Sequence, residues 1–257
     1  MDYQRTTEIT TGIAREVGDW ALTQFGRLAG ELKYNGTLVT SADRECERMI
    51  RERLGRHFPD HTVFGEETGF EGPEDSDWIW YLDPIDGTSN FIFGLSMWGV
   101  SIGLAYRGQP VAGAFHMPVT GRTYWAWHGG GAFRNGQRLQ VHDCDEMRPT
   151  DLVCLSSTVH ERYRLTFPQK YRSLGCAAEA LATTAAGSFA GLVHDHWHLH
   201  DIAAGVLLCR EAGAVITLDD GTPFESFNGI DPKGRAPALV IAGPRLHGRI
   251  LRCVQRK

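Results

Sequence analysis

The sequence lacks the features that mark membrane and exported proteins. Its longest apolar run, from Ile202 to Cys209, is broken by Gly205 and is far shorter than the roughly 20 residues that span a bilayer. The N-terminus, MDYQRTTEIT, has no apolar segment of the kind that a signal peptide requires. We therefore expect a cytoplasmic protein with no membrane anchor and no membrane partner.

Paired cysteines and surplus positive charge are lacking as well. The 6 cysteines include no CxxC pair, and several stand in apolar patterns that indicate burial as plain hydrophobic residues, as in a reducing compartment. The formal net charge is -5. A chain without a basic excess is poorly suited to neutralise the phosphates of a nucleic acid, so we expect no nucleic-acid partner. A small anionic substrate stays open, because local charge decides its binding.

Several common catalytic motifs are also missing. The sequence has no GxSxG, no GxxxxGK[ST] and no HExxH. The stretch GGGAFRNG at 129–136 lacks the spacing and the following helix of a dinucleotide-binding loop. These absences argue against a serine hydrolase of that type, a P-loop NTPase, a zincin and a Rossmann dehydrogenase.

Three successive patterns of apolar residues indicate the fold class. Residues 5–29 carry apolar side chains at helical spacing, and a second helix is expected over about 41–57, after a capping box at 40–43. Short β-rich runs over 61–128 predict a meander of largely antiparallel strands. Strands then alternate with helices, one of which ends at Gly213. The outline predicts an α+β fold with stacked layers.

Two aspartates flank a proline turn in YLDPIDGTSNF. Asp83 ends a strand, Pro84 forces a turn, Asp86 follows, and Gly87 lets the backbone approach a ligand closely. Two carboxylates that leave one strand in this way can converge on a hard cation, and oxygen ligands suit Mg²⁺. The alternative for an isolated motif is a turn with solvated aspartates.

Other acidic residues stand at similar places. Glu66 and Glu67, in VFGEETG, follow a short β run, which alone is more typical of an exposed loop. Asp201 opens an apolar helix and Asp43 stands near the start of another, where each is a common capping residue.

Taken together, these pieces resemble the inositol monophosphatase family of metal-dependent phosphatases in order and spacing. The motifs are LVTSAD, GEE, DPIDGT with SNF after it, and DIAAG, and the resemblance extends over nearly the whole chain. It implies a layered αβαβα sandwich of the inositol monophosphatase and fructose-1,6-bisphosphatase type. We expect one domain over 1–257, with an α+β part at about 1–148 that holds the metal site and an α/β part at about 149–257.

The resemblance implies a cluster of two or three Mg²⁺ ions. Glu66, Asp83 and the carbonyl of Ile85 would bind one ion, and Asp83, Asp86 and Asp201 would bind a second. A third, weaker ion would bind near Glu66.

The resemblance also implies catalytic and phosphate-binding roles. The Thr88 hydroxyl, paired with Asp43, would orient the attacking water, so Asp43, Glu66 and Thr88 form the expected catalytic set. Gly87 and Thr88 would present backbone N–H groups to the phosphate.

The expected substrate side is less like the family. Cys176 and Ala177, with Arg172, match a family segment that lines the substrate, and Lys33 resembles a family lysine near the metal loop. His194, with Asp195 beside it, stands where most relatives have a Glu that touches the substrate hydroxyls, and His200 replaces a Trp.

The row of histidines in HDHWHLHD is the other departure. If the segment were extended, its four histidines would share one face, which is a poor tetrahedral arrangement for Zn²⁺. We expect solvated or substrate-rim histidines there and take Asp201 as the metal ligand of this stretch.

The expected function is therefore a Mg²⁺-dependent phosphomonoesterase acting on inositol 1-phosphate or a similar small polyol phosphate. Histidinol phosphate and fructose 1,6-bisphosphate are alternative substrates, and a non-catalytic regulatory relative is an alternative of another class. Converging carboxylates argue against the last, since they repel one another without metal. The resemblance also implies a homodimer and inhibition by Li⁺.

Overall fold

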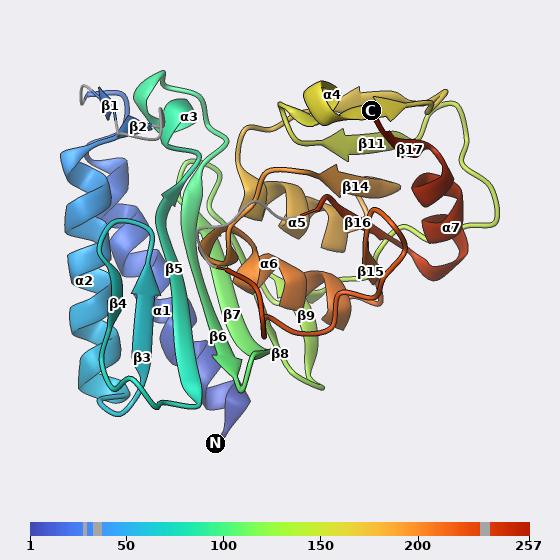
Figure 1. Cartoon of the computed structure of the whole chain (residues 1–257). Coiled ribbons are helices and arrows are strands. Elements are labelled where there is room, and N and C mark those ends of the chain that lie inside the picture. Colours follow the sequence, from blue (N-terminus) through green and yellow to red (C-terminus); the bar gives the residue numbers. More distant parts are fainter. Residues whose placement is uncertain (28–29, 33–37, 232–236) are drawn as a thin grey trace.

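Helices and sheets alternate as five layers in the computed structural model, which describes residues 1–27, 30–32, 38–231 and 237–257 (Figure 1). Helices α1 (Tyr3–Leu22) and α2 (Ser41–His57) cover the outer face of a large sheet. Helices α5 (Ala177–Ala185) and α6 (Leu199–Glu211) lie between this sheet and a smaller one, whose far face is covered by α7 (Pro244–Arg252). The expected αβαβα sandwich is thus confirmed.

The large sheet has eight strands, and one pairing within it positions the site. In spatial order the strands are β10 (Gln137–Arg138), β9 (Gly131–Arg134), β8 (Arg122–Trp127), β7 (Gln109–Met117), β6 (Gly99–Tyr106), β5 (Trp78–Asp86), β3 (Thr62–Gly65) and β4 (Gly69–Glu71). Neighbours are antiparallel except β3 and β5, which run parallel. The carboxyl ends of β3 and β5 therefore meet at one edge.

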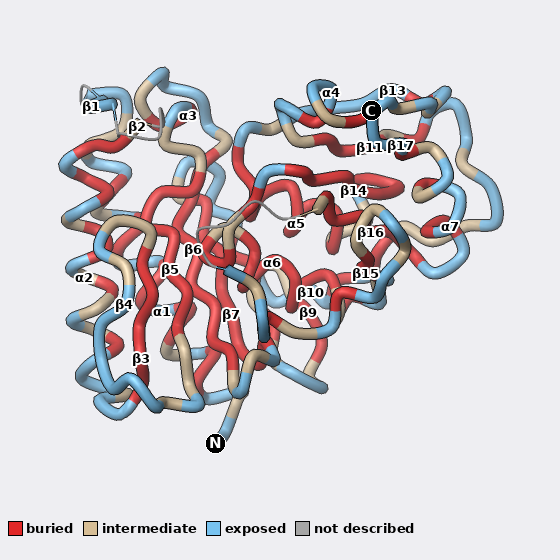
Figure 2. The backbone as a smooth tube through the Cα atoms, viewed as in Figure 1, coloured by how far each residue is buried: buried red, intermediate tan, exposed pale blue. Residues whose placement is uncertain are grey.

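The smaller sheet has five strands and is mixed. In spatial order they are β13 (Lys170–Arg172), β11 (Leu152–Leu155), β14 (Gly191–His194), β16 (Leu239–Ala242) and β15 (Val215–Leu218). Strands β11 and β14 are parallel, so their carboxyl ends also lie together. Figure 2 shows that the strands of both sheets are mostly buried.

The remaining elements are short. They are β1 (Glu31–Leu32), β2 (Leu38–Val39), α3 (Thr88–Ile92), α4 (Val159–Arg162), β12 (Tyr163–Leu165) and β17 (Val254–Arg256). Periodicity over so few residues is not readable in a sequence, which is why no pattern predicted them. In the part of the chain that the structure describes, no helix combines the length and the apolar character needed to cross a bilayer.

The two N-terminal helices show where local signals are reliable. Helix α2 begins and ends as predicted, and the Thr40 and Asp43 side chains form the expected capping box. Helix α1 instead ends at Leu22, before the predicted limit of residue 29. Phe25 lies in a turn, where its ring packs against Phe91 and Trp98, so its apolar spacing reflects core packing rather than a continued helix.

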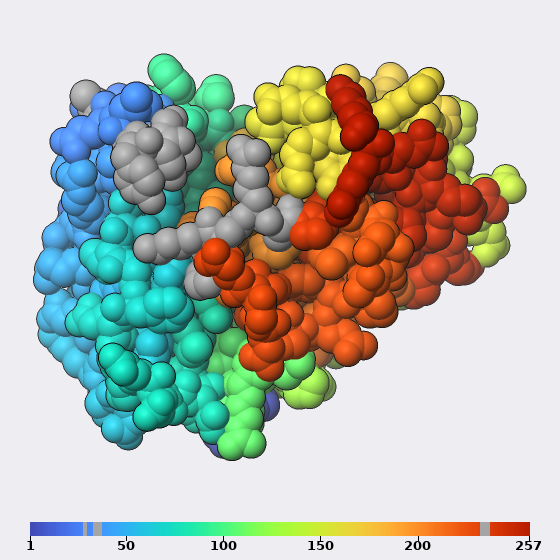
Figure 3. Space-filling model, in the orientation of Figure 1, coloured from blue at the N-terminus to red at the C-terminus, as the bar shows by residue number. Residues whose placement is uncertain are grey.

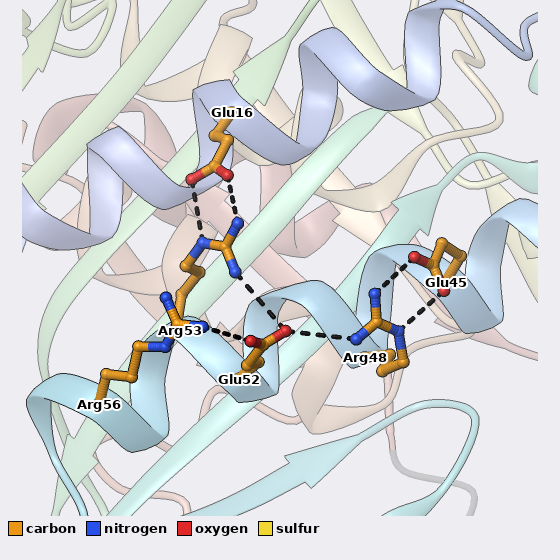
Figure 4. Close-up of polar contacts among 6 residues, drawn as sticks. All are labelled: Glu16, Glu45, Arg48, Glu52, Arg53 and Arg56. Carbon is orange, nitrogen blue, oxygen red and sulfur yellow. Dashed lines mark hydrogen bonds and ion pairs between the residues drawn. The ribbon is translucent and has the colours of Figure 1, made fainter.

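Salt bridges on the solvent side join α1 to α2 (Figure 4). Arg53 binds Glu16 across the two helices at 2.6 Å, and Arg48 binds Glu45 and Glu52 along α2. Exposed pairs of this kind each contribute at most about 1 kcal/mol. The helix pair is held mainly by its buried apolar faces, which include Val17, Cys46 and Ile50.

Helix α6 packs closely on the large sheet because glycine stands opposite it. A Cβ on Gly103 would lie 2.7 Å from both the Ala203 Cβ and the Ala204 nitrogen. These contacts are shorter than van der Waals separation, so a side chain here would push the helix away from the sheet.

We expect Gly103→Ala to lower the free energy of unfolding by about 1–3 kcal/mol, because overpacking forces backbone shifts. Urea unfolding measures this change. The matched control is Gly12→Ala, in the exposed middle of α1, where nothing lies within 4 Å of an added Cβ. The control is expected to gain about 0.5–1 kcal/mol from helix propensity. Similar effects of the two substitutions would contradict the packing argument.

Candidate active site

A pocket of about 440 Å³ lies where the strand ends of the two sheets meet. Figure 3 shows the two halves side by side, blue to green and yellow to red. The pocket has the size of a small-molecule site. Its lining includes Glu66, Asp83, Asp86, Thr88, Cys176 and Asp201.

Parallel pairing brings Glu66 to Asp83. Gly65 of β3 pairs with Leu82 of β5, and the Glu66 backbone N–H donates to the Leu82 carbonyl at 3.2 Å. The next residue of each strand is a carboxylate, so the two side chains leave the same edge together and both line the pocket.

The Asp83–Asp86 turn is a break in the β5–β6 register. Within it, the Asp83 carboxylate accepts a hydrogen bond from the Ile85 N–H at 3.1 Å. Asp86 accepts from the N–H groups of Ala177 (3.0 Å) and Ala178, at the start of α5. The helix N-terminus therefore holds Asp86 in place, and its donors are used by a carboxylate of the protein.

Asp43 lies behind Thr88, which lines the pocket. The Thr88 hydroxyl lies 3.2 Å from the Asp43 Oδ1 and 3.1 Å from the Ile85 carbonyl oxygen. The other Asp43 oxygen accepts from the Thr40 N–H and hydroxyl, at 2.8 and 2.6 Å. The capping box thus orients Asp43, which is fully buried, toward Thr88.

Gly87 is required at the start of α3. Its φ is +91°, which disfavours other residues, and a Cβ there would lie 2.8 Å from the Met97 carbonyl oxygen. The turn can therefore bring its backbone, with Thr88, to the pocket wall.

Asp201 reaches the pocket from the first turn of α6, but not as the N-cap residue that the sequence indicated. The helix begins at Leu199, so His198 is the N-cap and Asp201 is the third helical residue. The Asp201 carboxylate accepts from the His198 N–H at 2.6 Å. The physical role is still capping, now from the inner position of a capping box.

Two histidines flank the Asp201 carboxylate. His200 Nε2 lies 3.2 Å from one oxygen and His198 Nδ1 lies 3.5 Å from the other. The rings stack at 5.3 Å, and His200 is buried without lining the pocket, so the expectation of solvated or substrate-rim histidines is wrong for this residue. The backbone at 199–200 is helical rather than extended, and this brings both imidazole rings next to the Asp201 carboxylate. His198, His200 and Asp201 could together hold an ion.

The pKa values of the acidic groups diverge for clear reasons. Burial raises the pKa of Asp83 well above its usual range, and neighbouring carboxylates, chiefly Glu66 and Asp86, add to the shift. Burial and the Asp201 charge raise the pKa of Asp86 to about 7, against its backbone hydrogen bonds. Burial opposes ionisation of Asp201, but interactions with His200 and His198 prevail and lower its pKa to about 2.

This donor set fits divalent cations. Buried carboxylates that raise one another's pKa are relieved by a positive ion bound among them. The donors of Glu66, Asp83 and Asp86 are all oxygen, which suits Mg²⁺.

The expected substrate residues occupy different depths. His194 lines the pocket and is only 8% exposed, and neither ring nitrogen has a hydrogen-bond partner among the residues that the structure describes. Cys176, the N-cap of α5, and Ala177 also line it. The Asp195 carboxylate lies behind the wall, where it accepts from the Ser156 hydroxyl at 2.5 Å. Arg172 is exposed on β13, and Lys33 lies outside the described residues.

Sequence reasoning missed Glu47, a fully buried carboxylate on α2. It accepts from the backbone N–H groups of Glu67 (2.8 Å) and Thr68 (3.2 Å) and pairs with Arg51. Glu47 therefore anchors the loop that presents Glu66. The only available signal was its spacing of four from Arg51, which is equally typical of a surface pair.

Comparison with known proteins agrees with this geometry. The family model described as "Inositol monophosphatase family" matches residues 2–256. A fructose-1,6-bisphosphatase/inositol-1-monophosphatase from Aquifex aeolicus is 35% identical over 204 residues, which is 76% of each chain. The Nus factor SuhB of Pasteurella multocida is 32% identical over 257 residues, covering 94% of this chain and 92% of that protein.

A solved structure of similar fold is that of an IMPase from Thermotoga maritima. It superposes with a TM-score of 0.85 at 29% identity and covers 96% of this chain and 95% of its own. The sequence motifs, the layered fold and the family match over nearly the whole chain agree. The chain belongs to the inositol monophosphatase family, a family of phosphatases.

Proposed function

We propose that this protein is a Mg²⁺-dependent phosphomonoesterase that hydrolyses inositol 1-phosphate or a similar small polyol phosphate. The observation that carries the proposal is the convergence of Glu66, Asp83, Asp86 and Asp201 on one pocket. Such a cluster of acidic side chains is costly for a scaffold and useful for binding cations.

Two or three Mg²⁺ ions would be held by Glu66, Asp83, Asp86 and Asp201, together with the carbonyl of Ile85. Bound Mg²⁺ neutralises the phosphate dianion and lowers the pKa of water at the site. The contribution of the protein is to hold these oxygens in place through the parallel β3–β5 pair and the first turns of α5 and α6.

Thr88 and Asp43 are the proposed proton-handling pair. The Thr88 hydroxyl donates a hydrogen bond to Asp43, so its oxygen can accept a hydrogen bond from an attacking water. As the threonine oxygen takes the water proton, the hydroxyl proton would pass to the Asp43 carboxylate. Glu66, also on the pocket wall, would help to orient the water. Gly87 and Thr88, which line the pocket, would bind the phosphate through their backbone N–H groups.

The polar side chains of the pocket lining favour a polyol. Ser156, Ser157, Thr158 and His194 are among the lining residues, and burial lowers the pKa of His194, which favours its neutral form. Neutral imidazole and hydroxyl groups both donate and accept hydrogen bonds, as do the hydroxyls of a polyol. Cys176 and Ala177 are further proposed contacts in the lining, and Asp195 acts by holding Ser156.

The test is phosphate release from a substrate panel. Inositol 1-phosphate, histidinol phosphate and fructose 1,6-bisphosphate are compared by kcat/KM with and without Mg²⁺. We expect the highest kcat/KM for inositol 1-phosphate, and no phosphate release from any of the three substrates without metal. Failure to hydrolyse any small monoester with Mg²⁺ would overturn the proposal and favour a non-catalytic regulatory relative.

We expect metal removal to make stability strongly dependent on pH. Without metal, burial and the Asp201 charge raise the pKa of Asp86 to about 7, above its unfolded value. In EDTA the folded state should therefore bind more protons than the unfolded state between about pH 4 and 7. Stability should therefore fall as pH rises through that window, with Asp83 acting in the same direction. The lowered pKa of Asp201 acts only below this window. Thermal unfolding at pH 5 and 8 measures the effect.

Added Mg²⁺ should raise Tm much more at pH 8 than at pH 5, because it replaces protons in the cluster. An equal increase at both pH values would contradict the coupling.

Three further properties belong to the proposal. We infer a cytoplasmic location, a homodimer and inhibition by Li⁺, all from family resemblance. All 6 cysteines are free. Sedimentation and activity assays in LiCl test the last two.

A further inference from the structure

A second group of possible metal ligands lies away from the pocket, on the segment that connects the two sheets. His142 and Cys144 follow β10 of the large sheet, and Asp151 directly precedes β11 of the small sheet. Donor atoms of the three residues lie within 4.8 Å of one another. The group combines an imidazole, a thiol and a carboxylate, unlike the acidic residues of the pocket.

The three donors converge on one point. The Cys144 sulfur lies 3.3 Å from the His142 Nε2, and the same nitrogen lies 3.7 Å from the Asp151 Oδ2. A nucleophilic Cys-His-Asp triad needs the thiol and the carboxylate on opposite ring nitrogens, so that one orients the ring while the other exchanges a proton. Here the thiol and the carboxylate both lie beside the same ring nitrogen, Nε2 of His142. This arrangement argues against a triad and is typical of ligands around an ion.

These spacings match a tetrahedral site. With Zn–N and Zn–O near 2.0 Å and Zn–S near 2.3 Å, tetrahedral angles place neighbouring ligand atoms roughly 3.3–3.5 Å apart. The observed spacings of 3.3 and 3.7 Å need only small side-chain adjustments to reach these values.

The backbone around the ligands is held in place. The carboxylate of Asp143, between the two ligands, accepts from the Arg245 N–H at 2.9 Å and from its guanidinium at 3.0 Å. The Asp151 carboxylate accepts from the N–H of Arg148 at 2.7 Å and from its Nε at 3.0 Å. The donors are therefore largely preorganised, and the Asp151 oxygen that takes the Arg148 N–H keeps a lone pair for an ion.

We propose that His142, Cys144 and Asp151 bind Zn²⁺ at a site separate from the catalytic pocket. A thiolate and an imidazole select a borderline-soft ion, whereas the oxygen ligands of the pocket select Mg²⁺. Binding releases the thiol proton to solvent. The His142 side chain is 24% exposed, so water can supply the fourth ligand.

The site would stabilise the connection between the two sheets. Its ligands lie near both ends of the segment between β10 and β11, so a bound ion would join these ends and restrict the motion of the segment. The proposed zinc site and the catalytic pocket lie at opposite ends of α6. Val141, next to His142, donates its N–H to the carbonyl of Ala212 at the C-terminal end of the helix, whereas Asp201 lies in its first turn. At 1.5 Å per residue, Asp201 and Ala212 are roughly 16 Å apart along the helix axis. Loss of the site should leave catalysis unchanged.

The test uses Co²⁺ as a spectroscopic probe of the full-length, metal-stripped protein in saturating Mg²⁺. We expect one equivalent of Co²⁺ to produce a sulfur-to-metal charge-transfer band, and Zn²⁺ to displace it. Cys144→Ser should abolish the band. His142→Gln should weaken Co²⁺ binding by more than about 100-fold, because loss of a residue that only supports a metal ligand already costs about 10- to 100-fold. Cys253→Ser, at the other partly exposed thiol, is the matched control and should retain the band.

Thermal unfolding supplies a second measurement. Zn²⁺ should raise the Tm of the wild type but not of Cys144→Ser, while both hydrolyse substrate equally with Mg²⁺. The absence of a band in the wild type, or its persistence in Cys144→Ser, would overturn the proposal. Neither readout depends on phosphatase activity, so the zinc site and the proposed function fail independently.

Discussion

Asp83→Asn is expected to lower kcat/KM by at least about a thousandfold while leaving the fold intact. Asp83 lies among the other proposed metal ligands, so its loss would weaken Mg²⁺ binding at the centre of the site. Loss of a single electrostatic contact in other enzymes already costs roughly 10²–10³ in rate. Phosphate release measures the activity, and circular dichroism measures the fold. The matched control is Asp75→Asn, an exposed aspartate outside the pocket, which should keep wild-type activity.

The same substitution makes a prediction of opposite sign for stability. Burial and neighbouring carboxylates raise the pKa of Asp83, so a neutral amide removes repulsion from the metal-free protein. In EDTA at pH 8, Asp83→Asn should therefore have a Tm equal to or above that of the wild type. In Mg²⁺ the order should reverse, because the wild type gains the binding free energy. A variant with near wild-type turnover would refute the assignment of Asp83.

Glu47→Ala is expected to lower the free energy of unfolding by about 3 kcal/mol and to reduce activity as well. The Glu47 carboxylate is 1% exposed and its partner Arg51 is 11% exposed, so removing one member leaves the other charge poorly solvated. The N–H groups of Glu67 and Thr68 also lose their acceptor. Because these residues follow Glu66, the loop that presents this proposed ligand loses its anchor.

Glu52→Ala is the matched control on the exposed side of the same helix. Glu52 also pairs with arginines, but its side chain is 40% exposed, so the expected loss is at most about 1 kcal/mol. Glu47→Gln keeps an acceptor oxygen and should fall between the two. Urea unfolding and kcat/KM are measured on all three variants, and equal destabilisation by Glu47→Ala and Glu52→Ala would show that Glu47 is not an anchor.

Features that depend on neighbouring residues were predictable from the sequence. The capping box at Thr40 and Asp43 set the start of α2, and Gly213 stands just after Ala212, the C-cap of α6. The DPIDGT turn and its relation to the GEE motif were recognisable because both stand in short, specific motifs. These signals act over a few residues, so no knowledge of packing is needed to read them.

Features that depend on partners far apart in the chain were not predictable in the same way. The antiparallel meander was expected, but the parallel β3–β5 pairing, which brings Glu66 beside Asp83, was not. Helix α6 begins at Leu199, so Asp201 is its third residue rather than the expected N-cap, and His200 is buried. Short elements such as α3 carry too few residues for a periodic pattern.

The sequence by itself determined the chemistry that is available: the identities of the acidic side chains, the local turns that carry them, and the resemblance to a phosphatase family. Only the tertiary structure decided which of these side chains share a pocket, that Asp195 lies behind its wall, and that Glu47 is buried beneath the Glu66 loop. Charged groups repel or lose hydration when they gather. Their convergence is therefore imposed by the packing of helices and sheets, which depends on apolar contacts along the whole chain.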